Sequence, residues 1–375
     1  MALPLPDVQS VADCATFSHT VLPFLPQLQG LPTRICEAGK SLDSLKEIYL
    51  TTNPLVTAVA FCLSLAALVF IVSELTSNYS QVDRLWSILP TVYNGHFVVW
   101  ARMVGIQNQS LDTIAVISAI WSARLTFNYW RKGGYKLGAE DYRWEIVRSK
   151  INNRVLFTIF NIFFISLTQS LLLLLINTPT YTFLLLSQSP GAATQFSLPD
   201  LAFSRFAFCL IIIEYFADQQ QWDFHCAKHA YQKTARVPDQ YKDQFSPEDL
   251  DRGFVVSGLW SWCRHPNFVA EQAIWLTLYL WSCYRTGSYI QWTGLGVLGY
   301  LLIFQGSTRL TEWISAGKYP EYKEYQARVG RFIPRWTVEP KGVAAVKKNK
   351  SKARQSDEDA DGAEESTKNE GKKSK

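Results

Sequence analysis

Long apolar runs alternate with polar, charged segments over most of this 375-residue chain. About 20 apolar residues suffice for a helix to cross a membrane. The pattern predicts about seven such spans, over residues 55–75, 85–103, 111–130, 155–176, 201–217, 268–283 and 290–305. The predicted fold class is therefore all-α, a polytopic transmembrane helix bundle.

Some predicted spans carry polar side chains. The second holds Asn94 and His96, the third Arg124, and the fifth ends near Glu214. Polar groups are costly in hydrocarbon, so these spans should face the bundle interior or a cavity.

Outside the bundle we expect two further segments. Residues 1–50 form an N-terminal lumenal segment, and residues 51–340 form the transmembrane domain. Residues 341–375 consist mostly of Lys, Glu, Asp, Ser and Gly, a composition that cannot build a core, so a disordered cytosolic tail is predicted.

The charges of the connecting loops predict the orientation. Residues 131–154 hold seven Lys and Arg and residues 218–265 hold six, whereas 177–200 hold none. Basic loops stay on the cytosolic side, which places the C-terminus in the cytosol. There Lys372-Lys373-Ser374-Lys375 resembles a dilysine retrieval signal. We therefore expect a multi-pass protein of the endoplasmic reticulum membrane.

Composition narrows the chemistry. The seven cysteines form no CxxC pair, which argues against a disulfide framework or a zinc ribbon. The net charge of +5 is spread over loops, and this favours a membrane surface over nucleic acid. His225 and His229 have the i, i+4 spacing of metal ligands, but a polar helix end explains them as well, and no metal is predicted. A GxxxxGK[ST] phosphate loop and a GxSxG motif are absent.

The segment 262–271 concentrates the candidate chemistry. Arg264, His265, Asn267 and Glu271 lie together just before an apolar run. Asn267 and Glu271 are four residues apart and share one helical face. Such a group could hold a polar, phosphate-bearing ligand at the membrane edge. The alternative is a basic flank with a snorkelling arginine.

A second group lies on other spans. Arg124 lies in one predicted span toward its cytosolic end, and Glu214 and Asp218 repeat at a spacing of four across the end of another. They could contact a ligand, or Arg124 could pair with Glu214 or Asp218 inside the bundle and join helices without one.

Together these motifs resemble the steroid 5-alpha-reductase superfamily, most closely its branch called DUF1295, and sterol C14- and delta-7 reductases are related to it. The resemblance covers about residues 55–336. The residues that carry it are Ser257-Gly258-Leu259-Trp260, Arg264-His265-Pro266-Asn267-Phe268 and Glu271, with Asp83 and Trp86, Arg124, Glu140-Asp141-Tyr142-Arg143, Glu214, Asp218 and Gln221, Tyr322 and Tyr325, and Phe332-Ile333-Pro334.

The resemblance implies a membrane-bound reductase that uses NADPH to reduce an activated C=C bond in a lipid or sterol-like substrate. Arginines would bind the cofactor phosphates, Asn267 and Glu271 the nicotinamide, in a cavity open to the cytosolic side. Besides that substrate, only membrane lipids are expected partners. The cofactor-binding residues expected on this basis are Arg124, Asp141, Arg143, Glu214, Asp218, Arg252, Arg264, His265, Asn267, Glu271, Tyr322 and Tyr325.

The chain departs from the steroid reductases at two positions. Trp121 stands where they have a proton-donating Tyr, and Ile88 stands where they have an acidic residue. The catalytic residues are therefore unassigned, with Tyr93, Tyr129 and His265 as candidate proton sources. Two alternatives remain: an S-adenosylmethionine-dependent methyltransferase of the isoprenylcysteine carboxyl methyltransferase type, and a non-catalytic membrane protein of the same fold. Oligomeric state is not predicted.

Overall fold

The computed structural model describes residues 3–190 and 195–334, and within these ranges the chain is mostly helical. The predicted all-α fold is confirmed. Over the described residues, the one β-bridge joins Cys263 to Gly330. The α-helices are α1 Phe17–Thr20, α2 Leu25–Ala38, α3 Leu42–Thr51, α4 Pro54–Thr76, α5 Leu89–Met103, α6 Gln109–Arg131, α7 Tyr142–Ile151, α8 Arg154–Phe160, α9 Gln169–Leu175, α10 Thr178–Leu186, α11 Leu198–Thr234, α12 Pro247–Arg252, α13 Pro266–Thr286, α14 Gly294–Lys318 and α15 Tyr322–Arg328.

The chain divides into two compact units. The first takes the described residues up to Asp223 together with Pro266–Ile314, and the second takes Phe224–His265 with the described residues from Ser315 onward. The predicted tail 341–375, with its retrieval signal, lies outside the described residues.

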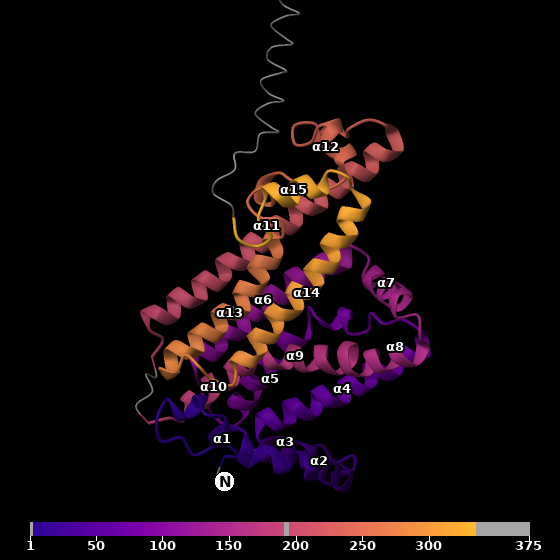
Figure 1. Ribbon diagram of the computed structural model, residues 1–375. Helices are drawn as coiled ribbons and strands as arrows, with labels where there is room; N and C mark the ends of the chain where they lie inside the picture. Colours follow the sequence, from indigo (N-terminus) through magenta and orange to yellow (C-terminus); the bar gives the residue numbers. More distant parts are fainter. Residues whose placement is uncertain (1–2, 191–194, 335–375) are drawn as a thin grey trace, which may run out of the picture. The chain divides into compact units, whose positions relative to one another are not determined.

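Two helical stretches of the first unit have the length and hydropathy needed to cross a membrane, Pro54–Thr76 and Arg154–Leu186. The start of α4 is well capped. The Asn53 side chain accepts a hydrogen bond from Leu55 N, and Pro54, at the first helical position, has no N–H that would need a partner. A π-helical segment, Asn161–Thr168, joins α8 to α9, and α4 packs along this segment and α9 (Figure 1).

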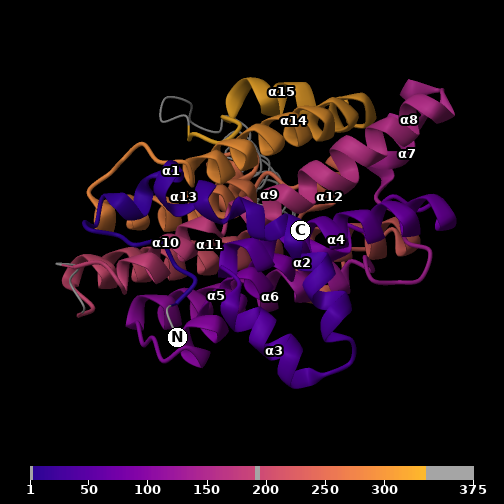
Figure 2. The ribbon, with the colours of Figure 1, turned by 90° about the horizontal axis from the view of Figure 1, so that it is seen from below.

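The other five predicted spans fall on α5, α6, α11, α13 and α14, but several boundaries differ. α11 continues to Thr234, past the predicted end at residue 217. The apolar run stops at residue 217, whereas the helix continues because the polar residues that follow still form intrahelical hydrogen bonds. α5 and α6 pack against each other, as seen from below in Figure 2.

Apolar side chains lie on both the inside and the outside of the first unit. Trp100, Trp121 and Trp281 are fully buried. On α4, by contrast, Leu68 and Leu75 are 56% and 80% exposed. Large exposed apolar side chains on a helix of this length favour contact with lipid.

The segment 177–200 contains structure that its sequence does not predict. α10 lies within it, and each of its nine residues is buried. It packs against α5, α6 and α13. At nine residues α10 is too short to cross a membrane by itself. Its place inside the first unit is evident only from the tertiary packing.

Residues 1–50 were expected outside the bundle, and here the structure differs. Val8, Cys14 and Val21 belong to the main apolar core. Asn53 Nδ2 donates to Pro4 O at 3.0 Å and to Tyr181 Oη at 2.9 Å. The N-terminal segment is therefore part of the first unit.

The second unit has its own apolar core, formed by Phe224, Ala227, Phe245, Leu250, Val255 and Trp260. A capping box begins α12, where Ser246 and Asp249 bond each other's backbone N–H. Arg264 N donates to Gly330 O at 2.9 Å, which ties the segment before α13 to the residues after α15.

Candidate functional site

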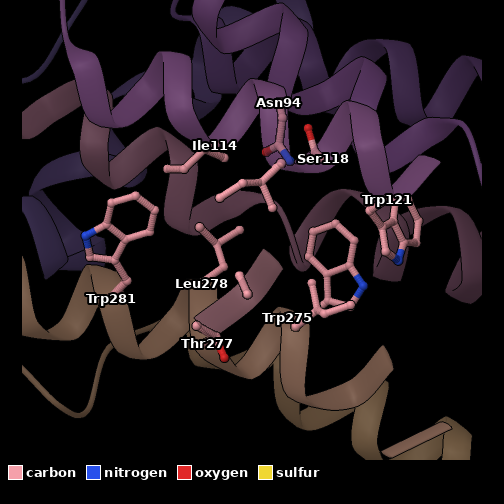
Figure 3. Close-up of a pocket in the computed structure, with 11 residues that line it drawn as sticks. Asn94, Ile114, Ser118, Trp121, Trp275, Thr277, Leu278 and Trp281 are labelled. Carbon is pink, nitrogen blue, oxygen red and sulfur yellow. The ribbon is translucent and has the colours of Figure 1, made fainter. Parts of the chain in front are cut away.

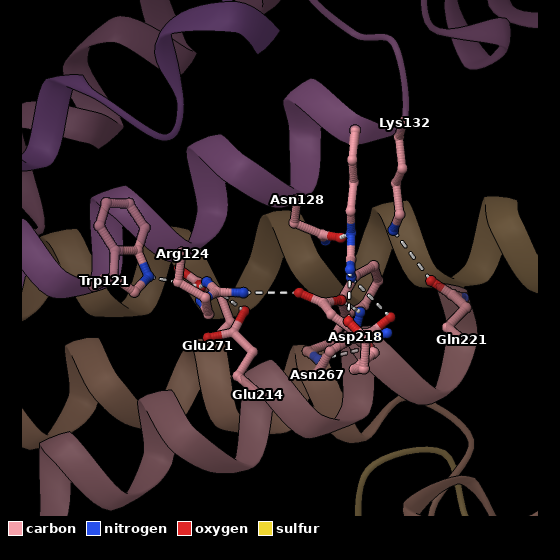
Figure 4. A network of polar contacts seen from close by, with 12 residues as sticks. Trp121, Arg124, Asn128, Lys132, Glu214, Asp218, Gln221, Asn267 and Glu271 are labelled. Carbon is pink, nitrogen blue, oxygen red and sulfur yellow. Dashed lines mark hydrogen bonds and ion pairs between the residues drawn. The ribbon is translucent and has the colours of Figure 1, made fainter. Parts of the chain in front are cut away.

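A buried ionic cluster lies where α6, α11 and α13 meet (Figure 4). Its centre is the guanidinium of Arg124 on α6. Nη2 lies 2.9 Å from Glu214 Oε1, and Nη1 lies 2.8 Å from Asp218 Oδ2. The same Nη2 lies 3.3 Å from Glu271 Oε2. One turn of α11 separates Glu214 from Asp218, so both carboxylates face α6.

Glu271 receives four donors. Trp121 Nε1 donates to Oε2 at 2.8 Å, beside the Arg124 contact. Trp275 Nε1 and Tyr300 Oη donate to Oε1 at 2.9 and 2.6 Å. A carboxylate has about four acceptor positions, and those of Glu271 are all used. Glu271 therefore organises the cluster and has little capacity left for a ligand.

The cluster has more acids than bases. Three carboxylates surround one guanidinium, and Asn267 Nδ2 adds a neutral donor to Asp218 Oδ1 at 3.1 Å. Two buried atoms, Arg124 Nε and Glu214 Oε2, have no hydrogen-bond partner among the described residues. Unsatisfied polar groups of this kind are costly in an interior. One donor and one acceptor are thus open to a ligand.

A second polar cluster in the first unit contains Asp141 and Arg143. Arg143 contacts Asp141 at 2.8 Å and donates from Nη1 to Ser307 Oγ at 2.6 Å. Burial opposes ionisation of Asp141, but the bonds from Arg143 outweigh it and hold the pKa of Asp141 below its usual value.

The same cluster includes Asp83, which accepts from Trp144 Nε1 at 2.7 Å. Burial raises the pKa of Asp83, although the charge of Arg143 and the Trp144 hydrogen bond act in the opposite direction. Asp83 and Trp86 were identified with the family motif, and Trp86 Nε1 donates to Gln169 Oε1 at 2.8 Å.

The remaining predicted cofactor residues lie in the second unit. Arg264 Nη1 donates to the carbonyl oxygens of Gln326 and Val329, and Arg252 pairs with Asp249 at 2.9 Å. The His265 ring lies against Phe332.

Two tyrosines of this unit have structural partners. Tyr325 Oη donates to Trp260 O at 2.5 Å, and the rings of Tyr322 and Phe254 meet edge to face.

The twelve predicted residues therefore fall into three groups. Arg124, Glu214, Asp218, Asn267 and Glu271 meet in the ionic cluster, whereas Asp141 and Arg143 form another cluster of the first unit. The other five belong to the second unit. The internal pairing weighed as an alternative for Arg124 is present. Three carboxylates around Arg124 would repel a phosphate, which argues against the phosphate-binding role expected for it.

Sequence reasoning missed Trp275 and Tyr300 and treated Trp121 only as a departure. All three donate to Glu271. The spacing of Trp275, one turn after Glu271, is a signal in the sequence. Tyr300 sits in an apolar run, and nothing in its neighbourhood along the chain marks it.

The rings of His225 and His229 lie 6.2 Å apart, and over the residues described there is no group of three or more His, Cys, Asp or Glu that could hold a metal ion. An apolar pocket lies between α5, α6, α11 and α13, and Trp121 and Trp275 line it.

The fold and the site thus define an all-helical protein that buries an ionic cluster beside an apolar pocket. The chain belongs to the family described as a protein of unknown function (DUF1295), which matches residues 69–329 and is the steroid 5-alpha-reductase-like branch expected above. It is 41% identical over 336 residues to an uncharacterized protein, C594.04c, of Schizosaccharomyces pombe. That alignment covers 89% of this chain and 94% of the relative. No solved structure matches the chain.

Proposed function

We propose that this protein is a membrane-bound, NADPH-dependent reductase of an activated C=C bond in a lipid or sterol-like substrate. The observation that carries the proposal is the ionic cluster. Residues from three separate motifs meet there, and among the described residues Arg124 Nε and Glu214 Oε2 have no hydrogen-bond partner. Membership of the steroid 5-alpha-reductase-like branch supports the same reaction class.

The open atoms suit a nicotinamide carboxamide, which has an amine that donates and a carbonyl that accepts. Glu214 Oε2 can accept from that amine, and Arg124 Nε can donate to that carbonyl. When bound, NADPH supplies a hydride. Glu271 would hold Trp121, Trp275 and Arg124 in position instead of contacting the cofactor.

Tyr300 is the candidate that this geometry favours as proton source. Its hydroxyl is buried and bonds Glu271 at 2.6 Å. Trp121 occupies the position of the missing phenol and donates to the same carboxylate. A phenol on α14 could thus replace one lost from α6.

The membrane part of the proposal follows from apolar surface and loop charge. α4 exposes large apolar side chains, and the apolar runs support about seven spans. We propose an endoplasmic reticulum location with the cofactor cavity open to the cytosol.

Ligand-induced stabilisation tests the proposal. The full-length protein in lipid nanodiscs is heated with NADPH or with S-adenosylmethionine. A ligand at a hundredfold excess over Kd stabilises by about 2.7 kcal/mol. We expect NADPH to raise the unfolding temperature, and Glu214→Gln to weaken this response. Arg102→Gln, in the exposed pair with Asp112, is the matched control.

Each outcome discriminates between classes. A shift with S-adenosylmethionine alone would support the methyltransferase alternative. A shift with neither ligand would favour a non-catalytic protein. An NADPH response that Glu214→Gln leaves unchanged would remove the ionic cluster from the cofactor site.

A further inference from the structure

The apolar pocket of the first unit has walls from four helices (Figure 3). It is lined by Ile114 and Ile117 of α6, by Leu278 and Trp281 of α13, and by Ala207 of α11. Its floor is shared with the ionic cluster, because Trp121 and Trp275 line the pocket and donate to Glu271. Such walls suit a hydrocarbon ligand.

Nearly all polar hydrogens on the lining side chains have partners elsewhere. Ser118 Oγ donates to Ala115 O at 3.0 Å, and Thr277 Oγ1 donates to Ala273 O at 2.6 Å, both within their own helices. The third lining indole, Trp281, donates to Asp200 Oδ1 at 2.7 Å. None of these donors needs a ligand.

Asn94 is the exception. It projects from α5 into the pocket (Figure 3) and is fully buried. Its Oδ1 accepts from Thr180 Oγ1 at 2.7 Å, which orients the amide. Its Nδ2 has no hydrogen-bond partner among the described residues. An amide donor buried in an apolar pocket without a partner is unfavourable, and an acceptor on a ligand would satisfy it.

We propose that this pocket binds a lipid through its hydrocarbon part, and that a carbonyl oxygen of the lipid accepts a hydrogen bond from Asn94 Nδ2. A carbonyl fits because it accepts without bringing a further donor into the pocket. In so far as the ligand is the substrate, the inference rests on the proposed function. The carbonyl is then the group that activates the C=C bond, and Asn94 is a specificity-determining residue.

The test uses two matched probes, a long-chain 2-alkanone and the alkane of equal length, each with a diazirine in its chain. Both are photolysed with the full-length protein in nanodiscs without NADPH, and labelled peptides of α6 and α13 are measured by mass spectrometry. We expect the ketone to label these helices roughly three- to tenfold more than the alkane, the range of one hydrogen bond.

Three variants test whether Asn94 causes the preferential labelling by the ketone probe. Asn94→Leu should label equally with both probes. Thr180→Val, which loses the bond to Oδ1 and keeps Nδ2, should retain the ketone preference. Leu278→Trp should fill the pocket and reduce labelling by both probes.

Equal labelling of the unaltered protein by ketone and alkane would overturn the inference without any variant. A ketone preference that persists in Asn94→Leu would do the same. Because NADPH is absent, these results are separate from the cofactor test. A ketone preference without NADPH-induced stabilisation would leave the pocket as a lipid site and reject the reductase.

Discussion

At the scale of single residues, Arg124 and Glu271 depend on each other through charge. Arg124 contacts three buried carboxylates, and Glu271 uses two indoles and a phenol to offset its own burial. Removing one partner from a buried ionic group leaves uncompensated charge, which costs more than the pair contributes.

Arg124→Met should therefore destabilise the protein by about 3–5 kcal/mol. Adding Glu214→Gln and Asp218→Asn should restore part of this loss, because the uncompensated charge is then removed. The measurement is thermal unfolding in nanodiscs. Arg102→Gln on the exposed pair should change stability by at most about 1 kcal/mol. Equal unfolding temperatures for Arg124→Met and Arg102→Gln would contradict a buried ionic cluster.

The pH dependence of stability tests the role of the Asp141 carboxylate. Its pKa in the folded protein lies below the usual 3.8, so its ionised form stabilises the fold above that pH, and this contribution is lost as the pH falls through the folded-state pKa. Asp141→Asn keeps an N-cap for α7 and removes the charge that Arg143 contacts.

We expect Asp141→Asn to lower stability by roughly 1 kcal/mol at neutral pH and to match the unaltered protein in strong acid. Denaturant unfolding at both pH values measures the difference. A deficit that is the same at both pH values would mean that the Asp141 carboxylate charge is not what stabilises this cluster.

At the scale of elements, glycines decide how closely helices approach. A Cβ on Gly296 of α14 would overlap the carbonyl oxygen of Leu175 and the nitrogen of Ile176. Both are backbone atoms, so α14 could not stay where it is. Gly306, on the same helix, has nothing within 4 Å of such a Cβ.

Gly296→Ala should thus destabilise by about 1–3 kcal/mol through overpacking. Gly306→Ala should be neutral or stabilising by up to about 1 kcal/mol, because Ala favours a helix over Gly. Thermal unfolding of the two variants side by side measures this. A Gly296→Ala protein as stable as Gly306→Ala would show that α14 does not pack closely on Leu175.

At the scale of the whole molecule, the proposed location and the proposed side of the cofactor cavity both depend on the membrane topology. In the proposed topology the loop charges favour a cytosolic C-terminus, and the proposed retrieval signal can act only there. A C-terminal tag should be digested by protease in sealed microsomes, and Lys372→Ser with Lys373→Ser should release the protein to later compartments while it stays in membrane. A protected tag would reverse the orientation and move the cofactor cavity to the lumen.

The sequence by itself determined the all-α class, the helices that coincide with its apolar runs, and the family. These depend on local hydropathy and on short motifs, both of which involve residues close together in the sequence. It also indicated that Arg124 could pair with Glu214 or Asp218, because Arg124 and Glu214 lie inside predicted spans, where a charged group needs a partner.

Only the tertiary structure decided which partners those polar groups have. The four donors to Glu271 come from α6, from its own helix α13 and from α14, and no local pattern identifies Tyr300. The same holds for α10, whose burial depends on its neighbours, and for Asn94, whose Nδ2 has no hydrogen-bond partner among the described residues. Packing brings distant residues together, and the chemistry of a buried site follows from that proximity.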